Sequence, residues 1–200
     1  MTSLLGGSMN NWLEAFRQSF SPLRIRNFRI YLGGQAISLV GTWLQMTAQG
    51  IVVYELSQGA ATPLGIVGML STLPILILSP WTGVWADRLD RRRLLIGTQV
   101  GAMLLAFSLA VLTQTGLIQL WHVYVLASLL GIFSAIDFPA QQAFIGDLSG
   151  MTEVRKAVNL NGITLQASRM LGPALAGYMI GALGAASAFW LNGLSFMAVI

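Results

Sequence analysis

The sequence contains no cysteine, a single histidine and no phosphate-binding loop of the Walker type. Without cysteine, neither a disulfide framework nor a cysteine-ligated metal site can form. One histidine, His122, provides neither a metal-binding cluster nor a serine–histidine pair with which to build a hydrolase site. The missing Walker loop makes ATP hydrolysis within this chain unexpected. We therefore expect a protein that is not an enzyme and that binds no metal or cofactor.

Charge is also scarce. Only 9% of the 200 residues are charged and 55% are hydrophobic, whereas soluble domains carry about 25% charged residues. A chain this apolar cannot cover its own surface with polar groups, so the lipid bilayer is its expected surrounding. The net charge of +4 does not indicate a nucleic-acid partner, because the basic residues lie in short clusters between apolar runs. The composition predicts an all-α membrane protein.

The distribution of apolar runs divides the chain into an N-terminal segment, residues 1–29, and a transmembrane bundle, residues 30–200. In the first segment, Trp12 and Phe16 share one face of a short amphipathic helix, which either lies at the membrane interface or packs on protein. A membrane-spanning helix needs about 20 apolar residues. The six expected spans are about 30–54, 64–86, 94–116, 121–145, 158–183 and 185–200, the sixth being cut short at the end of the chain.

The lysines and arginines are unevenly placed relative to these spans. Ten of the eleven fall before the first span, between the second and third, or between the fourth and fifth. The loops expected on the opposite side contain none. Because cytoplasmic loops are enriched in lysine and arginine, we expect a multi-pass protein with a cytoplasmic N-terminus.

Polar and charged side chains inside the spans mark a candidate cavity. Polar residues recur at spacings of three and four along the first span, so that one face is polar and either bonds neighbouring helices or lines a cavity; they are Gln35, Ser38, Thr42, Gln45 and Gln49. Asp137 and Arg169 are charges at similar depth inside the membrane, where charged residues are costly and commonly paired. We expect a direct or water-bridged pair between them, which is either purely structural or faces a cavity in which Asp137 takes up a proton. The candidate cavity residues are Gln35, Gln45, Gln141, Gln142, Asn161 and Arg169.

Small residues form one face of the fifth expected span. Ser168, Gly172 and Ala176 recur every four residues, and Gly177 lies beside them. Small side chains let two helices approach closely, and Pro173 adds a bend. We therefore predict that Gly172, Pro173 and Gly177 serve helix packing.

The segment between the second and third spans has six charges in the seven residues from Asp87 to Arg93. Together with Gly83, it resembles the cytoplasmic signature of the major facilitator superfamily, glycine-x-x-x-aspartate-arginine-x-glycine-arginine-arginine. Asp90 stands where that signature has its second glycine. The matching positions are Gly83, Asp87, Arg88, Arg91 and Arg92.

A second resemblance covers the segment 168–177, which is similar to the fifth-span motif of the exporter branch of this superfamily. The segments 24–45, 135–139 and 159–177 are most similar to a bacterial exporter group that includes enterobactin (siderophore) exporters. Many proton antiporters of the superfamily carry an arginine in the fourth span, where this chain has Ala127. That departure moves the expected proton site to Asp137.

The resemblance implies the N-terminal half of a twelve-span transporter, a six-helix bundle made of two three-helix repeats, with a C-terminal six-span half as its partner. It also implies proton-coupled export of a drug- or siderophore-like molecule across the bacterial inner membrane by alternating access. In the family the signature acts as a gate between the two halves, and Arg91 would pair with Asp147. The alternatives are a six-span assembly or docking protein and a non-functional half-transporter fragment.

Overall fold

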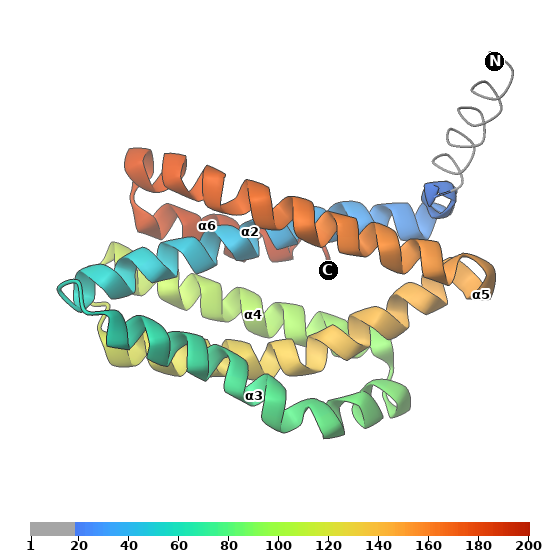
Figure 1. Cartoon of the computed structure of the whole chain (residues 1–200), viewed down its shortest axis with the longest axis horizontal. Helices are drawn as coiled ribbons and strands as arrows, with labels where there is room; N and C mark the ends of the chain where they lie inside the picture. The colour runs from blue at the N-terminus through green and yellow to red at the C-terminus, as the bar shows by residue number, and fades with distance from the viewer. Residues whose placement is uncertain (1–18) are drawn as a thin grey trace, which may run out of the picture.

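The computed structural model describes residues 19–200, except for the side chains of Ala86 and Asp87. The predicted amphipathic helix around Trp12 and Phe16 lies outside the described residues. The described chain contains a short 3-10 helix followed by α-helices (Figure 1). These are η1 (Ser21–Arg24), α2 (Arg26–Leu56), α3 (Ala61–Arg88), α4 (Arg91–Gln114), α5 (Leu120–Leu183) and α6 (Ala185–Phe196).

Helix α5 consists of two arms that meet at Gly150. This residue has φ 73° and ψ 164°, a backbone conformation that is essentially restricted to glycine. The first arm, residues 120–149, runs toward the turn, and the second arm, residues 151–183, doubles back (Figure 1). The expected spans end at residue 145 and resume at residue 158, and the charges between them predict a loop over 147–156. This prediction is wrong, because helix continues up to Gly150 and resumes directly after it.

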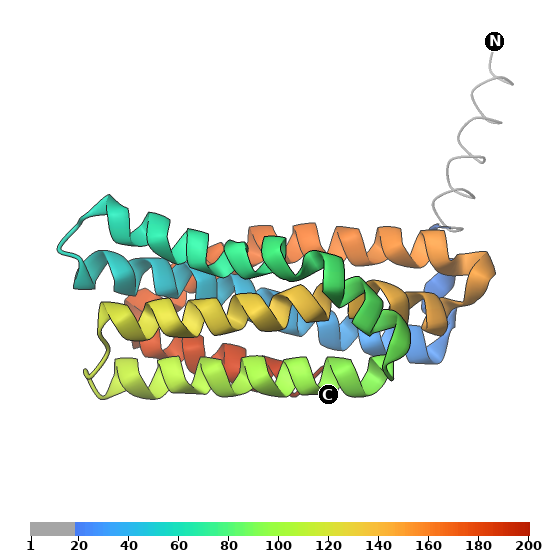
Figure 2. The same cartoon turned by 90° about the horizontal axis from the view of Figure 1, so that it is seen from below.

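The helices and the two arms of α5 lie side by side along one long axis (Figures 1 and 2). At one end lie η1, the link between α3 and α4, and the Gly150 turn. At the other end lie the links between α2 and α3, between α4 and α5, and between α5 and α6. Nine of the ten described lysines and arginines lie at the first end, which we call the basic end. The exception is Arg169.

Four helices, α2 to α5, are long and apolar enough to cross a membrane. Helix α2 begins at Arg26, before the predicted span starts at residue 30, and α3 continues to Arg88, beyond the predicted end at residue 86. The reason is that backbone hydrogen bonding continues a helix past its apolar section, which marks only the part inside lipid. Helix α6 ends at Phe196. The count of six spans stays a prediction.

The apolar side chains face outward as well as inward. In α3, Leu76 is 67% exposed, and none of the residues in the most apolar 18-residue stretch of this helix is buried. In the second arm of α5, Met170 and Tyr178 are also exposed. The bundle interior combines apolar clusters, such as that of Leu44, Leu109 and Phe189, with buried polar residues such as Gln45, and buried polar groups of this kind help to join helices in lipid.

The predicted face of small residues on the second arm is divided by the structure. Ser168, Gly172 and Ala176 are buried, and a Cβ atom at Gly172 would lie 2.3 Å from the Cβ of Trp43 on α2. Gly177 has open space around its Cβ direction and Pro173 is exposed, so neither packs on a helix among the described residues, and their role in helix packing stays a prediction. Each follows a packed residue by one position, and one residue turns the direction by about 100° around the helix.

Candidate functional site

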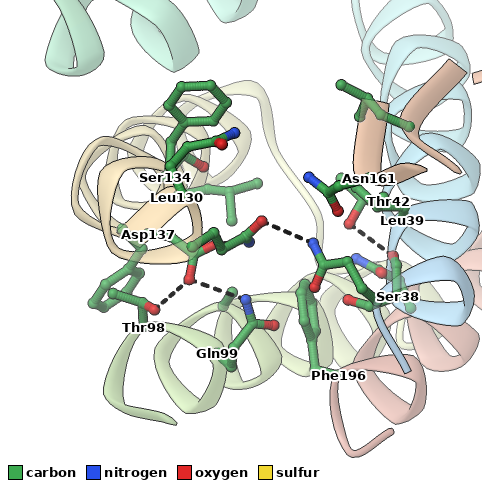
Figure 3. A pocket seen from close by; sticks show the side chains of 18 of the residues that line it. Ser38, Leu39, Thr42, Thr98, Gln99, Leu130, Ser134, Asp137, Asn161 and Phe196 are labelled. Carbon is green, nitrogen blue, oxygen red and sulfur yellow. Dashed lines mark hydrogen bonds between the residues drawn. The ribbon is translucent and has the colours of Figure 1, made fainter. Parts of the chain in front are cut away.

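A cavity of about 360 Å³ lies inside the bundle, lined by side chains from α2, α4, both arms of α5, and α6 (Figure 3). None of the described side chains of helix α3 lines it. Of the seven positions predicted as cavity or proton sites, five line this cavity. They are Gln35, Asp137, Gln141, Gln142 and Asn161.

Asp137 is bound by three neutral side chains. The Thr98 hydroxyl donates to its Oδ1 at 2.6 Å, and the Gln99 amide donates to the same oxygen at 3.0 Å (Figure 3). The amide of Gln141 donates to Oδ2. Thr98 and Gln99 belong to α4, whereas Gln141 lies one turn beyond Asp137 on its own helix. Both carboxylate oxygens therefore have donors, and the donors come from two sides.

The hydrogen bonding continues across the cavity to α2. Gln35 Nε2 donates to Gln141 Oε1 at 3.0 Å. A connected set of side chains thus links α4, the first arm of α5, and α2. We call Thr98, Gln99, Asp137, Gln141 and Gln35 the Asp137 network.

Arg169 is not part of this site. Within residues 19–200 it forms no ion pair with Asp137, so the prediction of a direct pair is wrong. Its guanidinium instead lies 5.4 Å from the centroid of the Trp43 ring, a cation–π contact on an exposed face. Similar depth along two helices predicts height in the membrane, but it does not predict the direction in which each side chain points around its axis.

Gln45 also lies outside the lining of the cavity, contrary to prediction. It is buried, and its Oε1 accepts a hydrogen bond from Asn192 Nδ2 at 2.7 Å. Asn192 of α6 does line the cavity, so Gln45 positions a lining residue. Of the two interpretations of the polar face on α2, bonding to a neighbouring helix describes Gln45 and cavity lining describes Gln35.

Sequence reasoning missed Thr98, Gln99 and Asn192. Thr98 and Gln99 are adjacent and therefore show no helical repeat, and Asn192 stands alone as the amide of its helix. The one available signal was the polarity of each residue inside an apolar span, because a buried polar group needs a partner.

At the basic end, Arg91 Nη1 lies 2.6 Å from Asp147 Oδ1 and joins the start of α4 to the end of the first arm of α5. The structure thus contains the pair that the resemblance implied. Asp90, in place of the signature glycine, has φ −62° and caps α4 by accepting a hydrogen bond from the Arg93 backbone nitrogen at 2.9 Å. Left-handed backbone geometry is therefore not required at Asp90.

The remaining positions of the signature show no contact that tests a gating role. The Asp87 side chain lies outside the described residues, Arg88 and Arg92 are exposed, and Gly83 has no neighbouring atom within 4 Å of its Cβ direction. The gating role of the signature stays a prediction.

A second contact at the basic end attaches η1 to the second arm of α5. The Ser21 hydroxyl donates to Glu153, and Lys156 Nζ lies 3.2 Å from the Glu153 carboxylate. The hydrogen bond from Ser21, followed by the bond and charge of Lys156, lowers the pKa of the Glu153 carboxyl.

Comparison with known proteins decides the family. A family model described as transmembrane secretion effector matches residues 17–200. The chain belongs to this family of the major facilitator superfamily. The match covers the lining of the cavity and both contacts at the basic end.

Several curated relatives are transporters. An uncharacterized MFS-type transporter of Bacillus subtilis is 31% identical over 82% of this chain and 38% of its own length. The staphyloferrin A transporter of Staphylococcus aureus is 30% identical over 87% of this chain and 42% of its own length. Macrolide efflux protein A of Streptococcus pyogenes is 25% identical over 80% of this chain and 39% of its own length. This member of the superfamily therefore spans about two fifths of the length of these relatives.

Proposed function

We propose that this chain forms the N-terminal, six-span half of a secondary transporter that exports a small organic molecule across the bacterial inner membrane. The observation that carries the proposal is a cavity of about 360 Å³, lined by both polar and apolar side chains, inside a bundle whose outer faces are apolar. Cavities of this size accommodate drug-sized ligands. Membership of the superfamily and the names of its siderophore and macrolide relatives support a small-molecule cargo.

The proposed orientation places the basic end in the cytoplasm. Nine of ten described lysines and arginines lie there, as the positive-inside rule requires of a cytoplasmic side. The exposed apolar faces of α3 and of the second arm of α5 would contact lipid or the C-terminal half. The Arg91–Asp147 pair is half-exposed at the same end, so it can break and re-form as the halves rock during alternating access.

Asp137 is the proposed proton site. Of the described residues that line the cavity, it is the one with an ionisable side chain. Its bonding partners are neutral, so protonation does not leave a buried cation without its counter-charge. Proton uptake at Asp137 would weaken the Asp137 network, which joins three of the structural elements around the cargo.

The test is efflux from proteoliposomes that contain the complete transporter, with and without an imposed pH gradient, using ethidium, erythromycin and staphyloferrin A as cargoes. We expect Asp137→Asn to abolish gradient-driven export while leaving exchange of the same cargo without a gradient. Retained exchange shows that the variant is folded and binds cargo. Unchanged gradient-driven export by Asp137→Asn would remove this residue from the coupling mechanism.

A further inference from the structure

Arg169 is a cation on the outer surface of the bundle, near the middle of a membrane helix. The second arm of α5 covers residues 151–183, so at 1.5 Å per residue Arg169 lies about 27 Å from one end of the arm and about 21 Å from the other. The hydrocarbon layer of a bilayer is about 30 Å thick. Arginines reach the lipid head groups when they lie near the ends of such helices. The exposed guanidinium of Arg169 therefore needs another source of stabilisation.

The ring of Trp43 gives part of this stabilisation. The guanidinium lies 5.4 Å from the ring centroid, and the Trp43 side chain is held in place because its Cβ packs against Gly172, one turn further along the arm. An aromatic ring attracts a cation through its quadrupole, but it carries no net charge. Trp43 therefore orients Arg169 without neutralising it, and a charge removed from water stays costly until a counter-charge meets it.

The described chain offers no counter-charge at this depth. Within residues 19–200 no carboxylate pairs with Arg169. Asp137 is already bound by side chains of α4 and of its own arm. A second copy of the chain would bring the same acids at the same depths, so it could not supply the carboxylate either. The other acidic residues of this part of the chain lie near the ends of helices; they are Glu55, Asp87, Asp90, Asp147 and Glu153.

The contact between Arg169 and Trp43 lies directly beside the cavity, although neither residue lines it. Leu165 lines the cavity one turn before Arg169, and Leu39 and Thr42 line it just before Trp43. Both α2 and the second arm of α5 lead away from the basic end (Figure 1). The contact therefore lies on the side of the cavity that is farther from the basic end, and a helix packed over it would border the cavity.

We infer that Arg169 forms an ion pair with an aspartate or glutamate in a membrane span of the C-terminal half. The inference rests on the proposed function, because it assumes that this chain is one half of a transporter. The relatives are long enough for a second half, since this chain spans 38% and 42% of two of them. The carboxylate accepts hydrogen bonds from the planar guanidinium fork, Trp43 supports the guanidinium from the side of α2, and the pair joins the two halves beside the cavity.

The test compares Arg169→Leu in two preparations, the chain alone and the complete transporter, both in lipid nanodiscs. In the chain alone the variant loses only the contact with Trp43, so we expect the Tm to fall by no more than about 2 °C. In the complete transporter it also leaves a carboxylate buried without a partner, so we expect the Tm to fall by at least about 5 °C. Arg169→Lys keeps the positive charge and should lower the Tm of the complete transporter less than Arg169→Leu does.

Gln166→Leu is the matched control, because Gln166 is an exposed, uncharged side chain one turn before Arg169. In the complete transporter it removes a polar group from the same arm without leaving a charge unpaired. It should therefore lower the Tm less than Arg169→Leu does.

A series of charge reversals identifies the partner. In a complete transporter that carries Arg169→Asp, each aspartate and glutamate in the spans of the C-terminal half is replaced in turn by arginine. One of these replacements should restore most of the Tm that Arg169→Asp loses, because it re-forms the ion pair with its charges exchanged.

Equal falls in Tm in the chain alone and in the complete transporter would overturn the inference. So would an equal effect of the Gln166→Leu control, or a series of charge reversals in which none restores the Tm. Thermal unfolding needs neither cargo nor a proton gradient. If the Tm values change as expected while the unmodified transporter exports none of the proposed cargoes, the export function fails and the ion pair stands.

Discussion

Gly172 sets the distance between α2 and the second arm of α5, and Gly172→Ala tests this contact. The added Cβ would lie 2.3 Å from the Trp43 Cβ, 3.2 Å from the Val40 carbonyl oxygen and 3.3 Å from the Leu44 nitrogen. Two of these atoms are backbone, and the Trp43 Cβ is fixed to the backbone, so no change of rotamer relieves the contact. Because carbon atoms pack at about 3.5–4.0 Å, the two helices must separate by about 1 Å.

The expected cost follows from two opposing effects. Overpacking of a well-packed contact destabilises by about 1–3 kcal/mol. Alanine in place of glycine in a helix interior returns about 0.5–1 kcal/mol. We expect the free energy of unfolding to fall by roughly 1–2 kcal/mol, which for a protein of this size corresponds to a decrease in Tm of about 2–8 °C.

The assay is thermal unfolding of the purified chain in one detergent, followed by circular dichroism, with Gly177→Ala as the matched control. Gly177 lies on the same arm and has no atom within 4 Å of its Cβ direction. That variant should be unchanged or more stable by about 0.5–1 kcal/mol. Equal stabilities of the two variants would refute the close approach of α2 to the second arm.

The remaining predictions concern the basic end. Arg91→Asp and Asp147→Arg should each destabilise by about 0.2–1 kcal/mol, as is typical of exposed pairs, and the double variant should recover most of the loss; strictly additive effects in thermal unfolding would show that the pair contributes nothing. The lowered pKa of Glu153 means that its stabilisation of η1 is complete above its unfolded pKa, about 4.3, and is lost as pH falls through the folded value. The protection of the η1 amides against hydrogen exchange, taken relative to the exchange rate of unstructured amides at the same pH, should therefore fall in acid, and in Glu153→Gln this pH dependence should be smaller than in the unmodified chain. Gly150→Ala should lower the free energy of unfolding by about 1–3 kcal/mol. The space around its Cβ direction is open, but alanine at φ 73° would have a strained backbone. An unchanged Tm in thermal unfolding would contradict this turn geometry.

The length of each apolar run predicted where helices lie, because a membrane helix must be apolar over its full crossing. It could not predict how the crossings are joined. The segment 147–156 is charged and was expected to be a loop, yet a single glycine, Gly150, makes the reversal and leaves helix on both sides. Charge next to a membrane shows that a segment is in water, and it does not show that the segment is unwound.

In the candidate site, hydrogen bonds within one helix could be predicted from the sequence, whereas hydrogen bonds between helices could not. Gln141 follows Asp137 by four residues, so their hydrogen bond lies along one helix face and could be expected from spacing alone. The bonds from Thr98 and to Gln35 cross between helices, and they depend on how far each helix is rotated about its axis. The rotation of each helix about its axis is set by close packing of small residues, such as Gly172 against α2. The pattern of residue types along the sequence does not give the angle of that rotation. Arg169 shows the consequence: its depth was compatible with Asp137, but the rotation of its arm directs it to the face of Trp43.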